Sequence, residues 1–129
     1  MGESVKRIHR NIVSGEAVTV TSALTVLGTY DISDMEACAF HFANTGVLLD
    51  QFVIYGQFVK DGAFEVLFSS TADFTTPAGI LIGSSGDLTG IANGSTGWFI
   101  LYPAGLRKIR VSAASSGANT VVTINGGGS

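Results

Sequence analysis

The residue types that most often carry catalysis are scarce in this chain of 129 residues. It holds two histidines, His9 and His41, and one cysteine, Cys38. A Ser–His–acid triad or a zinc site needs a histidine held in place beside a nucleophile or further ligands. His9 lies near the N-terminus, and His41 follows an apolar alternating run in which we expect a structural histidine. We therefore predict that the protein is not an enzyme, has no catalytic or metal-binding residues and needs no cofactor.

Cys38 lies within the alternating segment 36–42, Glu-Ala-Cys-Ala-Phe-His-Phe. Alternation in a β-strand places positions 38 and 41 on opposite faces, so His41 is not positioned to activate the thiol. A single cysteine also excludes an internal disulfide. We predict that Cys38 is a small buried hydrophobic residue, as free cysteines usually are.

Two further features suggest binding chemistry without supporting it. Asp31, Asp34 and Glu36 are close in sequence, but this spacing is more typical of solvated turn carboxylates than of a cation site. The glycine-rich segments 82–87 and 92–97 are followed neither by Lys-Ser/Thr nor by a helix, so the features that hold a phosphate are missing.

Trp98 is the one tryptophan, and it alternates with Ile100 and Tyr102. A sugar-binding module presents tryptophan and tyrosine at its surface as stacking platforms. The apolar alternation favours the opposite arrangement, and we predict that Trp98 lies in the core.

The charges are unevenly distributed around a net charge of −3. Lys6, Arg7 and Arg10 lie among the first ten residues, whereas residues 16–87 contain nine acidic residues and a single basic one, Lys60. A basic segment on an acidic body can steer the approach of a partner.

Residues 1–15 are predicted to form an extended N-terminal arm that binds an acidic or apolar groove of a partner. The basic side chains alternate there with apolar ones, which would prolong the contact. The predicted partner-binding residues are Val5, Lys6, Arg7, Ile8, Arg10 and Ile12.

A second basic cluster contains Arg107, Lys108 and Arg110. Binding of single-stranded nucleic acid would need exposed aromatic residues between the basic ones. We predict that the aromatic residues are mostly buried, so we expect this cluster to pair with acidic groups of this chain or of a neighbour. No stretch approaches the roughly 20 apolar residues that span a bilayer. We therefore expect neither a nucleic-acid nor a membrane partner.

Period-2 alternation and frequent turns predict one all-β domain over residues 16–125, an antiparallel β-sandwich that is jelly-roll-like. Residues 47–59 are apolar on both faces, which indicates a central strand, and Asp61-Gly62 predicts a two-residue hairpin turn. In the long connection 69–97, only residues 80–82 are predicted to form a short strand. Residues 126–129 are predicted to be a flexible tail. The predicted core residues are Phe40, Phe42, Phe52, Ile54, Phe64, Val66, Trp98, Ile100, Ile109, Val111 and Ile124.

The segment 97–126 resembles the closing strands of small structural proteins from tailed-bacteriophage virions. An aromatic strand, Trp-Phe-Ile-Leu-Tyr, is followed there by a tight turn, the basic-apolar strand Leu-Arg-Lys-Ile-Arg-Val and a final Thr/Val strand. The upstream segments Tyr30-Asp-Ile-Ser, Phe52-Val-Ile-Tyr-Gly-Gln-Phe and Phe68-Ser-Ser-Thr-Ala-Asp-Phe-Thr-Thr-Pro look similar. Within that group, chains of this size resemble capsid decoration, or cement, proteins.

The resemblance implies a structural protein that stabilises a phage capsid by binding its outer shell. It would be made in the host cytoplasm and located at the capsid surface, with the major capsid protein or another virion subunit as partner. A homotrimer is expected, and the apolar surplus of 47–59 and 98–102 also favours an oligomer. The alternative that the sequence leaves open is a carbohydrate-binding or receptor-binding β-sandwich module.

Overall fold

The computed structural model describes residues 10–70, 80–82, 91–103 and 105–129, and these residues contain nine β-strands. The strands are β1 (Arg10–Val20), β2 (Thr25–Asp31), β3 (Cys38–Thr45), β4 (Leu49–Gln57), β5 (Glu65–Ser69), β6 (Ile80–Ile82), β7 (Thr96–Leu101), β8 (Lys108–Ser115) and β9 (Thr120–Gly128).

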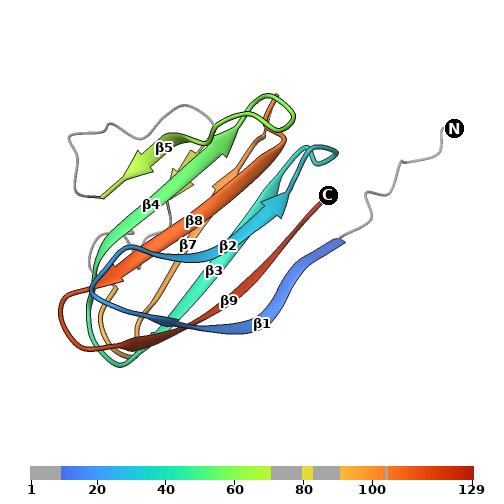
Figure 1. Cartoon of the computed structure of the whole chain (residues 1–129). Helices are drawn as coiled ribbons and strands as arrows, with labels where there is room; N and C mark the ends of the chain where they lie inside the picture. The colour runs from blue at the N-terminus through green and yellow to red at the C-terminus, as the bar shows by residue number, and fades with distance from the viewer. Residues whose placement is uncertain (1–9, 71–79, 83–90, 104) are drawn as a thin grey trace, which may run out of the picture.

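The strands form two antiparallel sheets packed face to face (Figure 1). One sheet has the order β1-β9-β3-β7-β6 and the other β2-β8-β4-β5. The partners β1–β9, β2–β8, β3–β7 and β4–β5 are those of a jelly roll, in which a long folded-over hairpin wraps into two sheets. β6 extends the first sheet beyond β7, which confirms the short strand predicted at 80–82. The predicted all-β sandwich is confirmed, and β4 is central, as expected from its apolar faces.

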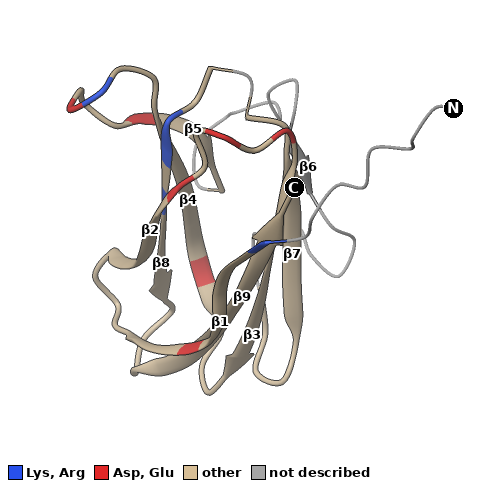
Figure 2. Ribbon diagram, turned by 90° about the vertical axis from the view of Figure 1, so that its right-hand side faces the viewer, with Lys and Arg blue, Asp and Glu red and all other residues tan. Residues whose placement is uncertain are grey.

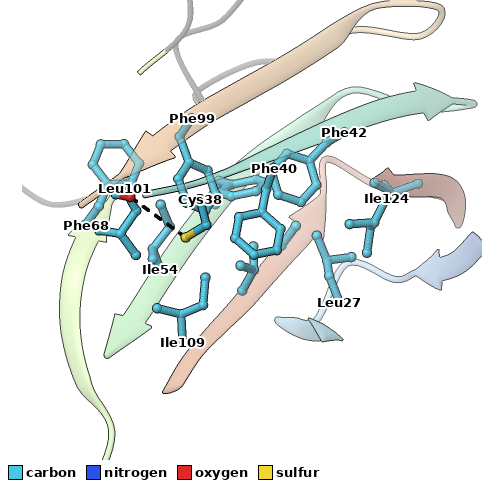
Figure 3. Close-up of a cluster of buried hydrophobic side chains, with 14 of the residues drawn as sticks. Leu27, Cys38, Phe40, Phe42, Ile54, Phe68, Phe99, Leu101, Ile109 and Ile124 are labelled. Atoms are coloured by element: carbon cyan, nitrogen blue, oxygen red, sulfur yellow. Dashed lines mark hydrogen bonds between the residues drawn. The ribbon is translucent and has the colours of Figure 1, made fainter. Parts of the chain in front are cut away.

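The core between the sheets is built around a group of phenylalanines (Figure 3). Phe40 stacks on Phe99 with ring centroids 5.3 Å apart, and Phe42 meets Phe52 edge-on at 4.9 Å. Seven of the eleven predicted core residues are buried. They are Phe40, Phe42, Phe52, Ile54, Ile109, Val111 and Ile124.

The prediction was wrong for β7, whose inward face carries Phe99 and Leu101. Trp98 and Ile100 lie on the opposite, outer face and are partly exposed. Every residue from Trp98 to Leu101 is apolar, so alternation alone does not choose a face. Pairing with β3 makes the choice, because it sets Phe99 opposite the inward Phe40.

The prediction was also wrong around β5, where Val66 is 43% exposed and Phe64, just before the strand, is only half-buried. Ile54 pairs with Phe68, but the next residue, Tyr55, pairs with Val66, so Leu67 forms a bulge. A bulge inserts one residue and reverses the alternation on one side of it. Phe68 therefore faces the core while Val66 does not.

Both ends of the sandwich differ from the predicted domain boundaries. Residues 10–15, predicted as part of the arm, belong to β1, and Arg10, Asn11 and Val13 pair with β9. Residues 126–129, predicted as a flexible tail, continue β9, which lies between β1 and β3 as far as Gly128. A Cβ on Gly126 would lie 2.5 Å from Cδ1 of Phe40, so glycine lets this end of β9 pass the core ring.

The turn at Asp61 is also not the predicted two-residue hairpin. Seven residues, 58–64, separate β4 from β5. The backbone N–H of Gly62 donates to the carbonyl of Val59 over 2.8 Å, and the residue with positive φ is Asp61, at 58°. Aspartate adopts this left-handed conformation more readily than most residues other than glycine.

The hydroxyl group of Tyr30 is buried without a hydrogen-bond partner among the described residues. The ring stacks on Phe40 at 5.2 Å, and the hydroxyl lies over Gly28, where a Cβ would collide with it. Burial raises the pKa of Tyr30 to about 12, with a smaller contribution from the charge of Glu16. We expect Tyr30→Phe to raise the free energy of unfolding by about 1 kcal/mol at pH 7, because it removes an unsatisfied buried group.

The same substitution has a predictable pH dependence. The folded protein holds the Tyr30 proton to a higher pH than the unfolded chain does. The unfolded chain therefore gains from ionising Tyr30 first, and the free energy of unfolding falls as the pH rises from 10 to about 12. Urea unfolding at neutral and alkaline pH should show a smaller alkaline loss for Tyr30→Phe than for the parent protein. A Tyr30→Phe protein less stable than the parent at pH 7 would show that the hydroxyl has a partner after all.

Candidate functional site

Two of the predicted partner-binding residues are built into the sandwich. Arg10 forms an ion pair with Asp34, and Ile12 is half-buried against the hydrophobic core. Both are therefore engaged by the fold itself. Val5, Lys6, Arg7 and Ile8 lie outside the described residues, and their role in binding a partner stays a prediction.

Cys38 and His41 lie on opposite faces of β3, as predicted. The Cys38 thiol is buried and donates to the carbonyl oxygen of Leu101 over 3.8 Å (Figure 3). Burial raises its pKa to about 11, so the thiol is protonated at neutral pH. In the described part of the chain, no three His, Cys, Asp or Glu side chains gather closely enough to hold a metal ion. None of these residues forms a helix long and apolar enough to cross a membrane.

The basic cluster at the start of β8 lies beside acidic groups of the same chain. Hydrogen bonds from the backbone and hydroxyl of Ser33 lower the pKa of Asp31, and the charges of Lys108 and Arg107 lower it further. A pocket of about 190 Å³ lies here. Its walls hold both signs of charge, from Asp31, Asp61, Lys60, Arg107 and Lys108.

Arg110 points to a different surface. Its guanidinium lies 4.1 Å from the centre of the Phe64 ring, and its Nε donates to the hydroxyl of Thr29 over 3.3 Å. Together with Leu24, Val26, Tyr55 and Ser112, these two side chains border a hollow of about 310 Å³ on the outside of the four-stranded sheet.

A third hollow, on the outside of the five-stranded sheet, has a volume of about 390 Å³. We call it the outer groove. Strands β1, β3, β7 and β9 all contribute to it. Its lining residues are Asn11, Val13, Ser14, Ala39, Phe40, His41, Trp98, Ile100, Asn125, Gly126 and Gly127.

Strand register explains the shape of the outer groove. Ala39 of β3 pairs with Ile100 on one side and with Gly127 on the other. Gly127 in turn pairs with Asn11 of β1. Ala39 and Gly127 are both small, so they form a low floor between Ile100 and Asn11. The groove is thus a depression in the sheet surface, bounded by larger side chains of β7 and β1.

The next row of residues brings together an aromatic and two polar side chains. His41 pairs with Trp98 of β7 and with Asn125 of β9, so the three lie side by side across the sheet. β1 is irregular between Val13 and Glu16, and there the backbone N–H of Gly15 donates to Oδ1 of Asn125 over 2.8 Å. This contact holds the Asn125 amide at the edge of the outer groove.

Among the described residues, those that line the outer groove include no Lys, Arg, Asp or Glu. Strands β3, β7 and β9 contain no Lys, Arg, Asp or Glu, and their ribbons are accordingly tan in Figure 2. The charges of the described residues lie on β1, β2, β4, β5, β8 and the connecting loops instead.

Sequence reasoning missed this site because it placed Trp98 in the core. A usable signal was present in β3, where the outward positions alternate Ala39, His41 and Ala43 between buried phenylalanines. Such small outward residues on a central strand leave space above the sheet.

No protein-family model matches this chain, and no curated protein matches it. Among solved structures, the crystal structure of the SPBc2 prophage-derived protein YomS has a similar fold. The TM-score is 0.54 at 13% sequence identity, and the match covers 96% of this chain and 99% of that one. The likeness shows that the two proteins share one fold along almost their whole length. The chain is an all-β protein of two packed antiparallel sheets, and its structural neighbour is prophage-derived.

Proposed function

We propose that this chain is a structural protein of a tailed-bacteriophage virion. The observation that carries the proposal is the shared fold with a prophage-derived protein over almost the full length of both chains. The segment 97–126, which resembles virion proteins in sequence, forms β7, β8 and most of β9. It therefore supplies interior strands to both sheets. A fold hosts many functions, so the binding role rests on surface features as well.

We further propose that the protein decorates the outer capsid shell and does no catalysis. Exposed large apolar side chains support a chain that buries surface in an assembly. They are Leu24, Val26, Leu48, Phe58, Val59, Val66, Tyr102 and Val121. Leu24 and Val26 border the hollow beside Phe64 and Arg110 on the four-stranded sheet, and this face is our candidate contact within a homotrimer.

The proposed contact with the major capsid protein, or with another virion subunit, uses the residues that precede β1. β1 is an edge strand, and Arg10 at its start is exposed, so the segment is joined to the sandwich at a sheet edge. Lys6 and Arg7 carry the positive charges of this segment, with Val5 and Ile8 beside them. Arg10 and Ile12 are not part of the proposed contact, because they are engaged within the sandwich.

Binding to phage heads that lack this protein tests the proposal. The purified protein should co-sediment with such heads, and the double substitution Lys6→Glu/Arg7→Glu should weaken binding at least tenfold. Raising the salt concentration should slow association, because salt screens exposed charges. Lys60→Glu is the matched control, a charge reversal in the loop between β4 and β5 that should leave binding unchanged. An intact protein that fails to co-sediment would refute capsid decoration.

A further inference from the structure

We propose that the outer groove is a binding site for a neutral saccharide, with Trp98 as its stacking surface. This function goes beyond assembly into a virion and does not depend on it. The argument rests on the shape of the groove, its polar groups and its lack of charge.

The size and walls of the groove suit a small ligand. Its volume of about 390 Å³ lies within the range of roughly 300–1,000 Å³ typical of ligand sites. Trp98 and Ile100 form one wall, and Val13 stands on the β1 side. A sugar ring has an apolar face of C–H groups, and an indole ring offers a broad apolar surface for it. Tyr102, 51% exposed, lies two residues beyond Ile100 and provides a second exposed aromatic residue.

Polar groups lie beside the aromatic wall at the places where sugar hydroxyls would be found. Directly paired residues in a sheet have Cβ atoms about 5 Å apart, so the His41 and Asn125 side chains are within reach of a ring stacked on Trp98. Asn125 uses its Oδ1 to accept from Gly15, which leaves the amide Nδ2 able to donate. The His41 ring and the Trp98 indole N–H make no hydrogen bond to another described residue. Hydroxyl groups both donate and accept, so they match this mixed set.

The lining residues of the outer groove include no lysine, arginine, aspartate or glutamate, and this favours a neutral ligand over a charged one. A phosphate-bearing ligand or a nucleic acid would need basic groups, and those of the described residues lie elsewhere. A large apolar protein surface would fit poorly over Asn11, Ser14, His41 and Asn125, whose polar atoms it would desolvate. A neutral, hydroxyl-rich ligand can stack on the aromatic wall and form hydrogen bonds with the polar side chains around it.

Trp98 is itself the reporter, because it is the one tryptophan of the chain. We expect its fluorescence to change saturably when neutral tetrasaccharides of glucose, galactose or N-acetylglucosamine are added, with at least one of the three binding. Isothermal titration calorimetry should give the same affinity. Trp98→Ala should weaken the calorimetric affinity at least tenfold, as truncation of a central aromatic contact commonly does. His41→Ala should weaken it severalfold.

Val66→Ala is the matched control, since it removes an exposed apolar side chain from the opposite sheet and should leave the affinity unchanged. Circular dichroism should show that all variants keep the β fold. Failure of all three tetrasaccharides to bind would overturn the proposal, as would binding that survives Trp98→Ala. A fluorescence shift that depends on protein concentration alone, with sedimentation of a larger species, would show that a second copy covers the groove and would equally overturn it.

Discussion

Replacing Phe99 by alanine is expected to lower the free energy of unfolding by about 3–5 kcal/mol, the range for large-to-small substitutions at buried aromatic positions. The Phe99 side chain is fully buried, with ring centroids 5.3 Å from Phe40 and 5.9 Å from Phe42. Its removal leaves a cavity between the sheets that the neighbouring rings can fill only in part. Urea unfolding followed by circular dichroism measures the loss.

The adjacent residue provides a matched control. Trp98 is larger than Phe99 but lies on the outer face of β7, partly in contact with solvent. Trp98→Ala should therefore cost less, about 1 kcal/mol, because less apolar area leaves water on folding at that position. If Trp98→Ala proved the more damaging of the two, the assignment of the two faces of β7 would be reversed, and the outer groove with it.

The second large effect is expected at the C-terminal end of β9. Gly126→Ala would place a Cβ 2.5 Å from the Phe40 ring, whereas a Cβ on Gly117, in the turn before β9, would meet nothing within 4 Å. We expect Gly126→Ala to cost about 2 kcal/mol or more, since overpacking a core typically costs 1–3 kcal/mol. Gly117→Ala should change stability by less than about 0.5 kcal/mol, as surface substitutions usually do. Thermal unfolding of the two variants makes the comparison.

Removal of residues 126–129 extends the same test. Besides the β9 pairing, Ser129 accepts a hydrogen bond from the backbone N–H of Glu36 over 2.8 Å and donates one to the carbonyl of Ala37 over 3.1 Å. The shortened chain should therefore unfold at a clearly lower temperature than the full chain. Equal melting temperatures, together with equal effects of alanine at positions 126 and 117, would mean that this end of the chain is the flexible tail that the sequence suggests.

Sequence patterns predicted the inward face of a strand where large apolar residues alternate regularly with small or polar ones. In β3, Phe40 and Phe42 alternate with Ala39 and His41, and the pattern admits a single inward face. In β7 both faces are apolar, and only the pairing of Phe99 with Phe40 decides between them. That pairing joins residues far apart in sequence, which alternation does not encode.

The glycines at the end of β9 illustrate a second limit. A run of three glycines has no side-chain pattern, and its conformational freedom favours a flexible segment. In the folded chain, Gly126 lies against the Phe40 ring and Gly128 against the backbone of Ala37, so the missing side chains are what permits the packing. The outer groove depends on this arrangement, because its floor is formed by Gly127 of β9 and its partner Ala39 of β3.

The direct test of the central claim, that this chain is a virion structural protein, is its copy number in phage particles. Particles carrying the gene would be purified on a density gradient, and their proteins quantified by mass spectrometry against the major capsid protein. We predict that the chain is present in a fixed ratio to the capsid protein and that antibodies label it on the outside of intact heads. Its absence from purified particles, with the protein found only in the surrounding lysate, would contradict the claim.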